Sequence, residues 1–198
     1  MADTYTAKTM DQRLHNLNGI SANQIDQHWT LYQGYVNKTN ELWGALEQAD
    51  RSKANQTYSA IREAKVELSF AWDGVILHEY YFDNLGGGGG NPPDDVRKVL
   101  EAAYGSYDAW VEDFKASGIS ARGWVIVSWD PKANRVFNYV ADAHNSYGIW
   151  NATPLLVLDT YEHAYMVDYG VKRPPYIDAF MNNIDWNVVA QRLAAAKK

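Results

Sequence analysis

Five consecutive glycines, Gly86 to Gly90, followed by Asn91-Pro92-Pro93, interrupt the chain of 198 residues near its middle. No helix can continue through this segment, because glycine and proline are the residues least compatible with a helix interior. A phosphate-binding loop would need a preceding strand and a following Lys-Ser/Thr, and the segment has neither. We therefore interpret it as a flexible linker between an N-terminal domain, residues 1–90, and a C-terminal domain, residues 91–198.

Two long helices are predicted before the glycines. Ser21, followed three residues later by Gln24, has the capping-box pattern, so a helix is expected over residues 21–48. Helical spacing places several of its large side chains near one face, namely Ile25, His28, Tyr32, Tyr35 and Leu42. A second helix is expected over residues 56–84, and its latter half is apolar on nearly all sides and should be buried. Together they predict an α-helical hairpin.

The chain after the glycines mixes short helices with strands. Helices are expected over residues 94–104 and 106–116, the second closed by Ser117-Gly118. β-Branched and aromatic runs predict strands at 124–129, 135–140 and 155–158, the first two joined by a turn at Asp130-Pro131. Helices return near 174–182 and 185–196. The predicted fold class is α+β: a helical hairpin lobe and an α+β lobe with a small three-stranded antiparallel sheet.

Composition excludes several classes of function. The chain has no cysteine, which excludes disulfides, iron–sulfur clusters, cysteine nucleophiles and thiolate zinc sites. Its formal net charge of -6 and the lack of a basic stripe exclude nucleic acid as a partner. Neither a membrane span nor a signal peptide pattern is found, so we expect a cytoplasmic protein that does not bind membranes.

The chain has only 5 histidines, and each has an ordinary structural explanation. His15 lies in a polar segment and is expected to be solvated, whereas His28 and His78 suit histidines satisfied inside the core. Asp159 and His163 are four residues apart and would share one face of a helix. Such a pair can chelate a metal ion, and it is equally compatible with a supporting hydrogen bond or a catalytic dyad.

The residues around this pair carry a resemblance to a known family. Asp159-Thr-Tyr-Glu-His163-Ala-Tyr165 resembles the Asp-x-Trp-Glu-His-Ala-Tyr signature of the iron/manganese superoxide dismutases. The similarity continues along nearly the whole chain beyond about the first fifteen residues, at Ile20-Ser21, Tyr35-Val36, Leu77-His78, Asn84-Leu85, Gly123-Trp124, Asp168-Tyr169 and Ile184-Asp185-Trp186. The fold of that family is the two-lobed fold predicted above.

The resemblance implies a metal centre and a reaction. Its ligands would be His28 and His78 from the helical lobe, with Asp159 and His163 from the α+β lobe. Three imidazoles and one carboxylate suit one iron or manganese ion per subunit, whereas calcium would require more oxygen ligands. The implied reaction is the disproportionation of superoxide to oxygen and hydrogen peroxide.

One departure from the family concerns a glutamine that hydrogen-bonds the metal-bound solvent in many members. Of the two positions that can supply it, the one on the second helix is Gly74 here, and the one before the Asp motif is His144. We hypothesise that His144 takes the glutamine's role and sets the redox potential through the solvent ligand. The alternative is an ordinary histidine of a surface loop.

A second departure lies in the first helix, which is one residue shorter between His28 and the Tyr35-Val36 pair than in many members. Tyr32 replaces a family histidine of the gateway to the metal, and Tyr35 is assigned as the gateway tyrosine. One deleted residue rotates those that follow by about 100°. The gateway is therefore rebuilt, or the family helix has a bulge that is absent here. Core packing would also explain both tyrosines.

Further family positions concern the walls of the site and the subunit contact. Phe82 and Tyr161 stand where the family has tryptophans, whereas Trp124 is kept. Glu162 resembles the family glutamate that bridges to a partner subunit, so a homodimer or a higher homo-oligomer is expected. Two alternatives to a dismutase stay open: a non-haem iron oxygenase, and a metal-binding protein of the same fold with lost or altered activity.

Overall fold

The computed structural model describes residues 4–198, and its N-terminal part is a helical hairpin. A short 3-10 helix, η1 (Gln12–Asn16), precedes α1 (Ala22–Gln48), which is followed by η2 (Arg51–Lys53) and α2 (Ala60–Asp83). Ser21 caps α1 by accepting a hydrogen bond from the Gln24 amide at 3.1 Å. In a capping box the Ser21 amide would donate to the Gln24 side chain, but it donates to the Asp168 carboxylate at 2.7 Å instead. The predicted capping box is therefore wrong in this second hydrogen bond.

The second helix begins at Ala60, four residues later than predicted. The Asn55 side chain accepts hydrogen bonds from the amides of Thr57 and Tyr58, and this turn holds residues 55–58 outside the helix. Ser59 then caps the helix by accepting from the Arg62 amide at 3.3 Å. A local side-chain turn has therefore displaced the helix start.

The glycine segment joins the two lobes, but it is packed rather than flexible as predicted. The amides of Gly86 and Gly89 donate to the carbonyls of Asn183 (2.8 Å) and Ile184 (3.1 Å). A Cβ atom at Gly87 would lie 2.3 Å from the Cα atom of Asp185. The glycines let two backbones approach this closely, and four of them, Gly86, Gly88, Gly89 and Gly90, also have positive φ angles.

The C-terminal part is an α+β lobe, which confirms the predicted fold class. Its helices are α3 (Asp94–Tyr104), α4 (Tyr107–Ser120), α5 (Met166–Tyr169), α6 (Arg173–Met181) and α7 (Trp186–Ala196), with η3 (Glu162–Ala164) before α5. The predicted end of α4 near residue 116 is wrong. Gly118 lies inside the helix, where the lack of a side chain admits Ile177 of α6 and Leu158.

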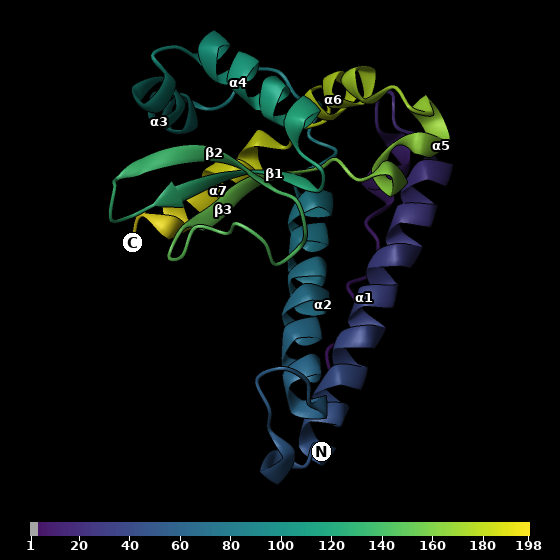
Figure 1. The fold of residues 1–198 in the computed structure, drawn as a ribbon. Helices are drawn as coiled ribbons and strands as arrows, with labels where there is room; N and C mark the ends of the chain where they lie inside the picture. Colours follow the sequence, from purple (N-terminus) through teal and green to yellow (C-terminus); the bar gives the residue numbers. More distant parts are fainter. Residues whose placement is uncertain (1–3) are drawn as a thin grey trace.

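The sheet consists of β1 (Trp124–Asp130), β2 (Arg135–Ala141) and β3 (Thr153–Asp159) in the antiparallel order β2-β1-β3. Trp124 at the start of β1 pairs with Asp159 at the end of β3, so the register places an indole beside the predicted carboxylate ligand. Figure 1 shows the hairpin projecting below the sheet, with the start of α1 and the end of α2 at the α+β lobe. Within residues 4–198, no helix has both the length and the apolar character needed to cross a bilayer.

Candidate metal centre

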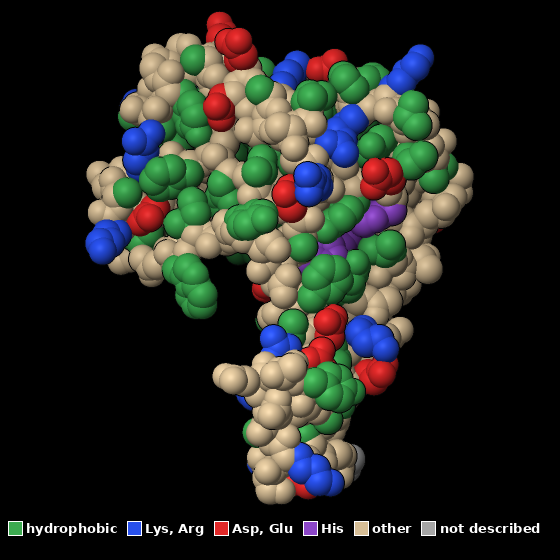
Figure 2. All heavy atoms as spheres, in the orientation of Figure 1, with side chains coloured by type: hydrophobic (Ala, Val, Ile, Leu, Met, Phe, Trp, Pro, Cys, Tyr) green, Lys and Arg blue, Asp and Glu red, His purple; other side chains and the backbone are tan. Residues whose placement is uncertain are grey.

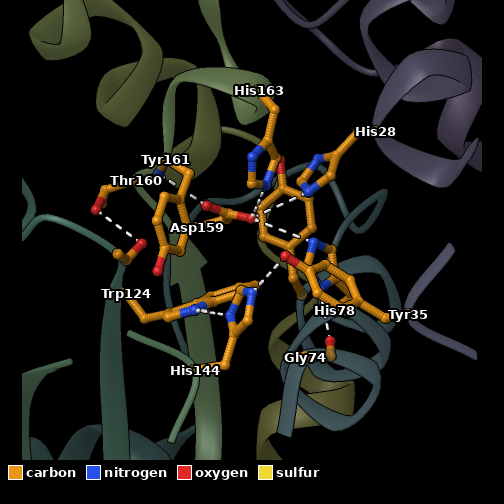
Figure 3. Close-up of polar contacts among 12 residues, drawn as sticks. His28, Tyr35, Gly74, His78, Trp124, His144, Asp159, Thr160, Tyr161 and His163 are labelled. Carbon is orange, nitrogen blue, oxygen red and sulfur yellow. Dashed lines mark hydrogen bonds and ion pairs between the residues drawn. The ribbon is translucent and has the colours of Figure 1, made fainter. Parts of the chain in front are cut away.

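Four residues from both lobes meet where the hairpin joins the α+β lobe (Figure 3). His28 comes from the start of α1 and His78 from the end of α2. Asp159 is the last residue of β3 and His163 lies in η3, so the expectation that this pair shares one face of a helix is wrong. One potential ligand atom from each lies within 4.8 Å of the others. The fold thus brings together the four residues that the resemblance implies as ligands.

The Asp159 carboxylate lies at the centre of this cluster. Its Oδ2 atom is 3.0 Å from Nε2 of His28, 3.2 Å from Nε2 of His163 and 3.7 Å from Nε2 of His78. Its Oδ1 atom accepts a hydrogen bond from the Tyr161 amide at 2.8 Å, which fixes the plane of the carboxylate. One carboxylate oxygen and three imidazole nitrogens therefore face a common point.

Burial and charge determine the protonation of these groups. Burial alone would raise the pKa of Asp159, but His163 and His28 beside it hold that pKa well below its usual range. Burial lowers the pKa values of His28 and His78, because a charged imidazole is costly away from water. The cluster thus offers an anionic carboxylate and at least two neutral imidazoles, which are the forms that bind metals.

His78 shows directly that the cluster fits a cation. Its Nδ1–H donates to the Gly74 carbonyl at 2.6 Å, so Nε2 carries a lone pair. This Nε2 atom is buried and has no hydrogen-bond partner among residues 4–198. An unpaired buried acceptor is costly, and a metal ion among the four side chains would satisfy it. Three imidazoles with one carboxylate are a donor set that iron and manganese accept.

Two supporting contacts of the cluster were missed in the sequence. The Tyr176 hydroxyl donates to the Asp159 carbonyl at 2.8 Å from the middle of α6. Gln24 donates to the His163 carbonyl at 2.6 Å and accepts from the Val167 amide at 3.1 Å. Because Gln24 fits a capping box in the sequence, its contact with the His163 backbone was not predicted. No local sequence pattern around Tyr176 predicts its hydrogen bond to Asp159.

Beside the cluster, a chain of hydrogen bonds runs from Trp124 through His144 to Tyr35 (Figure 3). The Trp124 indole N–H donates to His144 Nδ1 at 2.9 Å, and an indole nitrogen can only donate. His144 in its neutral form therefore carries its proton on Nε2, which donates to the Tyr35 hydroxyl at 2.7 Å. Burial lowers the pKa of His144 to about 4, so it is neutral at physiological pH.

Gly74 provides the space for this arrangement. A Cβ atom there would lie 3.0 Å from Cδ1 of Tyr35 and 3.3 Å from Cδ2 of His144. The helix position where some family members carry the glutamine is thus filled by side chains from α1 and from the loop after β2. The absence of a side chain at Gly74 thus leaves room for the His144 ring.

The two tyrosines of α1 point to different surroundings. Tyr35 faces the centre, with its ring 5.3 Å from that of His78. The hydroxyl of the fully buried Tyr32 instead donates to Glu79 at 2.7 Å and accepts from the Lys8 amide at 2.9 Å. The helix passes without a bulge from Ala22 to Gln48, so Tyr35 reaches the centre by regular helical geometry.

Aromatic rings enclose much of the centre. Trp124 lies edge-on to His78 at 5.0 Å, Phe82 lies 5.0 Å from His28, and Tyr161 is stacked on His163 at 5.2 Å.

The side chain of His163 remains 26% exposed, and its neighbour Glu162 lies at the surface. Figure 2 shows histidine side chains visible at the surface where the two lobes meet. His15 lies apart from the cluster and pairs with Asp26 at 2.7 Å.

Comparisons with known proteins agree with this site. Residues 92–192 match the C-terminal domain of the iron/manganese superoxide dismutases. An iron superoxide dismutase of Aquifex aeolicus is 50% identical over 188 residues, which cover 92% of this chain and 88% of that protein.

More distant relatives include an iron enzyme of Cupriavidus metallidurans, 35% identical across 97% of this chain and 98% of its own. A manganese superoxide dismutase of Haloferax volcanii is 33% identical across 85% of this chain and 84% of its own. Similarity of this extent, together with a buried three-histidine, one-aspartate cluster between two lobes, shows that the chain belongs to the iron/manganese superoxide dismutase family.

Proposed function

We propose that this protein is a superoxide dismutase that holds one iron or manganese ion per subunit. The observation that carries the proposal is the cluster of His28, His78, Asp159 and His163, in which the buried His78 Nε2 has no hydrogen-bond partner within the described part of the chain. A bound iron or manganese ion supplies the one-electron oxidation and reduction that convert two superoxide ions and two protons into oxygen and hydrogen peroxide. The similarity to iron and manganese superoxide dismutases supports the same activity.

The residues of the chain hold the cluster and handle protons. Asp159 supplies the single negative charge of the ligand set, so an ion of charge two or three leaves the centre net positive and attractive to a small anion. The Gly74 carbonyl orients His78, and Gln24 and Tyr176 hold the backbone of His163 and Asp159. Trp124, Phe82 and Tyr161 serve as walls that limit access to small substrates.

Tyr35 and His144 are proposed as the catalytic pair beside the ligands. A glutamine amide carries two N–H groups, whereas neutral His144 has one, which it donates to Tyr35. His144 therefore acts through Tyr35 rather than directly on a solvent ligand. The Tyr35 hydroxyl accepts this hydrogen bond and keeps its own proton to donate toward the centre. Tyr32 has no part in this pair, since its hydroxyl is committed to Glu79 and Lys8.

The division into domains and the assembly are part of the proposal. The boundary between residues 1–90 and 91–198 is supported by the glycine segment that joins the two lobes. A homodimer in which Glu162 contacts the partner subunit is supported by the exposure of this residue beside the candidate ligand His163. A cytoplasmic location remains a prediction from the sequence.

Metal analysis combined with a dismutase assay tests the proposed function. Separate loading with iron and manganese should give one ion per subunit and activity with at least one of the metals. His163→Ala should lose metal and activity, whereas His15→Ala, a histidine outside the cluster, should keep both. One bound ion without activity in either form would favour the metal-binding protein, whose support is the altered gateway around Tyr35 and Tyr32.

A further inference from the structure

A second group of aromatic side chains begins behind His78 and leads away from the centre. The Tyr32 ring lies 6.5 Å from that of His78. Tyr5, from the N-terminal segment that runs along the hairpin, packs edge-on against Trp72 at 5.0 Å. Trp72 in turn lies 5.4 Å from Trp43, and both indoles are partly exposed.

The two tyrosines of this group share one carboxylate oxygen. Tyr32 and Tyr5 donate to Oε1 of Glu79 at 2.7 and 2.8 Å, so their hydroxyl oxygens are at most 5.5 Å apart. Glu79 is 9% exposed, and its Oε2 atom lies 3.4 Å from the Lys8 ammonium. Packing of the N-terminal segment against the hairpin would not by itself require two phenols to share one nearly buried carboxylate oxygen.

This arrangement suits the oxidation of tyrosine. Burial and the Glu79 carboxylate raise the pKa of Tyr5 to about 12 and also raise that of Tyr32, so both phenols keep their protons at neutral pH. A phenol that loses an electron becomes strongly acidic and needs a proton acceptor at hydrogen-bond distance. Glu79 is in that position for both rings. Within residues 4–198, the Tyr35 hydroxyl has no carboxylate hydrogen-bond partner, and its neighbour Phe70 is not readily oxidised.

We propose that Tyr32, Tyr5, Trp72 and Trp43 form a hole-transfer chain that carries oxidising equivalents from the metal centre to the surface of the hairpin. This inference rests on the proposed dismutase function, because that reaction supplies hydrogen peroxide. An iron ion held by the four residues would, in its reduced form, supply the electron that splits peroxide into hydroxide and hydroxyl radical. Hole transfer along these four residues would move the oxidising equivalent away from the ligand histidines and Trp124.

The steps balance in electrons and protons. Hydroxyl radical takes one electron from Tyr32 and becomes hydroxide, while the phenol proton of Tyr32 moves to Glu79. Tyr5 then gives an electron to the Tyr32 radical and its proton to Glu79, as Tyr32 recovers a proton from Glu79. Trp72 then gives an electron to the Tyr5 radical, and Glu79 returns the proton to Tyr5. Trp43 in turn gives an electron to the oxidised Trp72. The tryptophan radical at the surface loses its N–H proton to water, and it takes a hydrogen atom from a thiol or combines with oxygen.

Peroxide challenge of the iron-loaded protein tests the chain without depending on turnover. Peroxide is added in small portions, radicals are trapped by rapid freezing for electron paramagnetic resonance, and added oxygen atoms are located by peptide mass spectrometry. We expect a tyrosyl signal, with products concentrated at Trp72 and Trp43. In Tyr5→Phe these products should be largely lost, and oxidation should rise at Trp124 and the ligand histidines. Dismutase activity before the challenge should be unchanged.

Controls separate hole transfer from simple exposure. Tyr58→Phe removes a tyrosine that is 73% exposed in the same lobe, and it should leave the product map as in the unmodified protein. Trp72→Phe provides a second break that keeps a ring in place and should also protect Trp43. The proposal would be overturned if Trp43 in Tyr5→Phe or Trp72→Phe, or in the metal-free protein, were oxidised as much as in the unmodified iron-loaded protein. Loss of dismutase activity in every form would instead count against the proposed function.

Discussion

Gly74 shows how one missing side chain shapes the centre. Its carbonyl orients His78, and its empty Cβ position is in contact range of both Tyr35 and His144. We predict that Gly74→Ala displaces this pair while His78 stays in place, because the three atoms nearest to the Cβ position belong to the side chains of Tyr35 and His144. Metal content should be retained, and the dismutase rate should fall by about tenfold to a hundredfold, since catalysis is sensitive to small displacements.

Gly44→Ala is the matched control for this prediction. Gly44 also lies in the hairpin, but a Cβ atom there would have no neighbour within 4 Å among residues 4–198. Alanine should therefore leave activity unchanged and raise the free energy of unfolding by about 0.5–1 kcal/mol. Both variants are compared by metal analysis, steady-state rate and denaturant unfolding. Full activity of Gly74→Ala would contradict the positioning of Tyr35 and His144 by this space.

At the scale of elements, the glycine segment fixes the end of α2 against the turn between α6 and α7. Leu85 and Ile184 form an isolated antiparallel bridge, and the Asp185 amide donates to the Asn84 carbonyl at 2.8 Å. Arg13 adds an ion pair to Asp185 at 3.0 Å and a hydrogen bond to the Asp83 carbonyl at 2.9 Å. These contacts place the helix that carries His78 relative to the α+β lobe.

Gly87→Ala should disturb this junction. The new Cβ atom would lie 2.3 Å from the Cα atom of Asp185, so one of two hydrogen-bonded backbones must move. We expect the free energy of unfolding to fall by about 1–3 kcal/mol in denaturant titrations of the metal-free protein. Gly34→Ala, in an open position on α1, serves as the control and should not be destabilising. Unchanged stability of Gly87→Ala would show that the segment yields easily, as a flexible linker would.

At the scale of the whole molecule, the exposed side of the centre is the basis for the proposed homodimer. His163 is 26% exposed, and two apolar side chains nearby, Met166 and Val167, are 42% and 43% exposed. A candidate ligand beside an apolar surface suits coverage by a second subunit. We predict a dimer by sedimentation at micromolar concentration, with Glu162 at the contact.

Charge reversal tests that contact. Glu162→Arg should shift the protein toward monomer, because the charge at the two-fold contact changes sign in both subunits. Glu112→Arg makes the same change at an exposed position of α4 and should leave the dimer intact. A monomeric unmodified protein, or equal dimer stability of both variants, would contradict the assigned role of Glu162.

Local patterns were sufficient to predict both long helices, the three strands and the α+β class, because these features depend on nearby residues. The resemblance around Asp159 and His163 also named four residues that the fold brings within 4.8 Å. Element ends were predicted less well. The Asn55 turn delayed α2, and contact of Gly118 with Ile177 extended α4, since tertiary packing and side-chain turns override local helix signals.

The sequence by itself determined which residue types are available for the centre: five histidines, no cysteine, and an Asp–His pair four residues apart. Only the tertiary structure decided that Tyr35 faces His144 while Tyr32 turns to Glu79, and that the glycine segment is packed against Asp185. The physical reason is that spacing fixes which helix face a residue occupies. Its hydrogen-bond partner is fixed by segments that arrive from elsewhere in the chain.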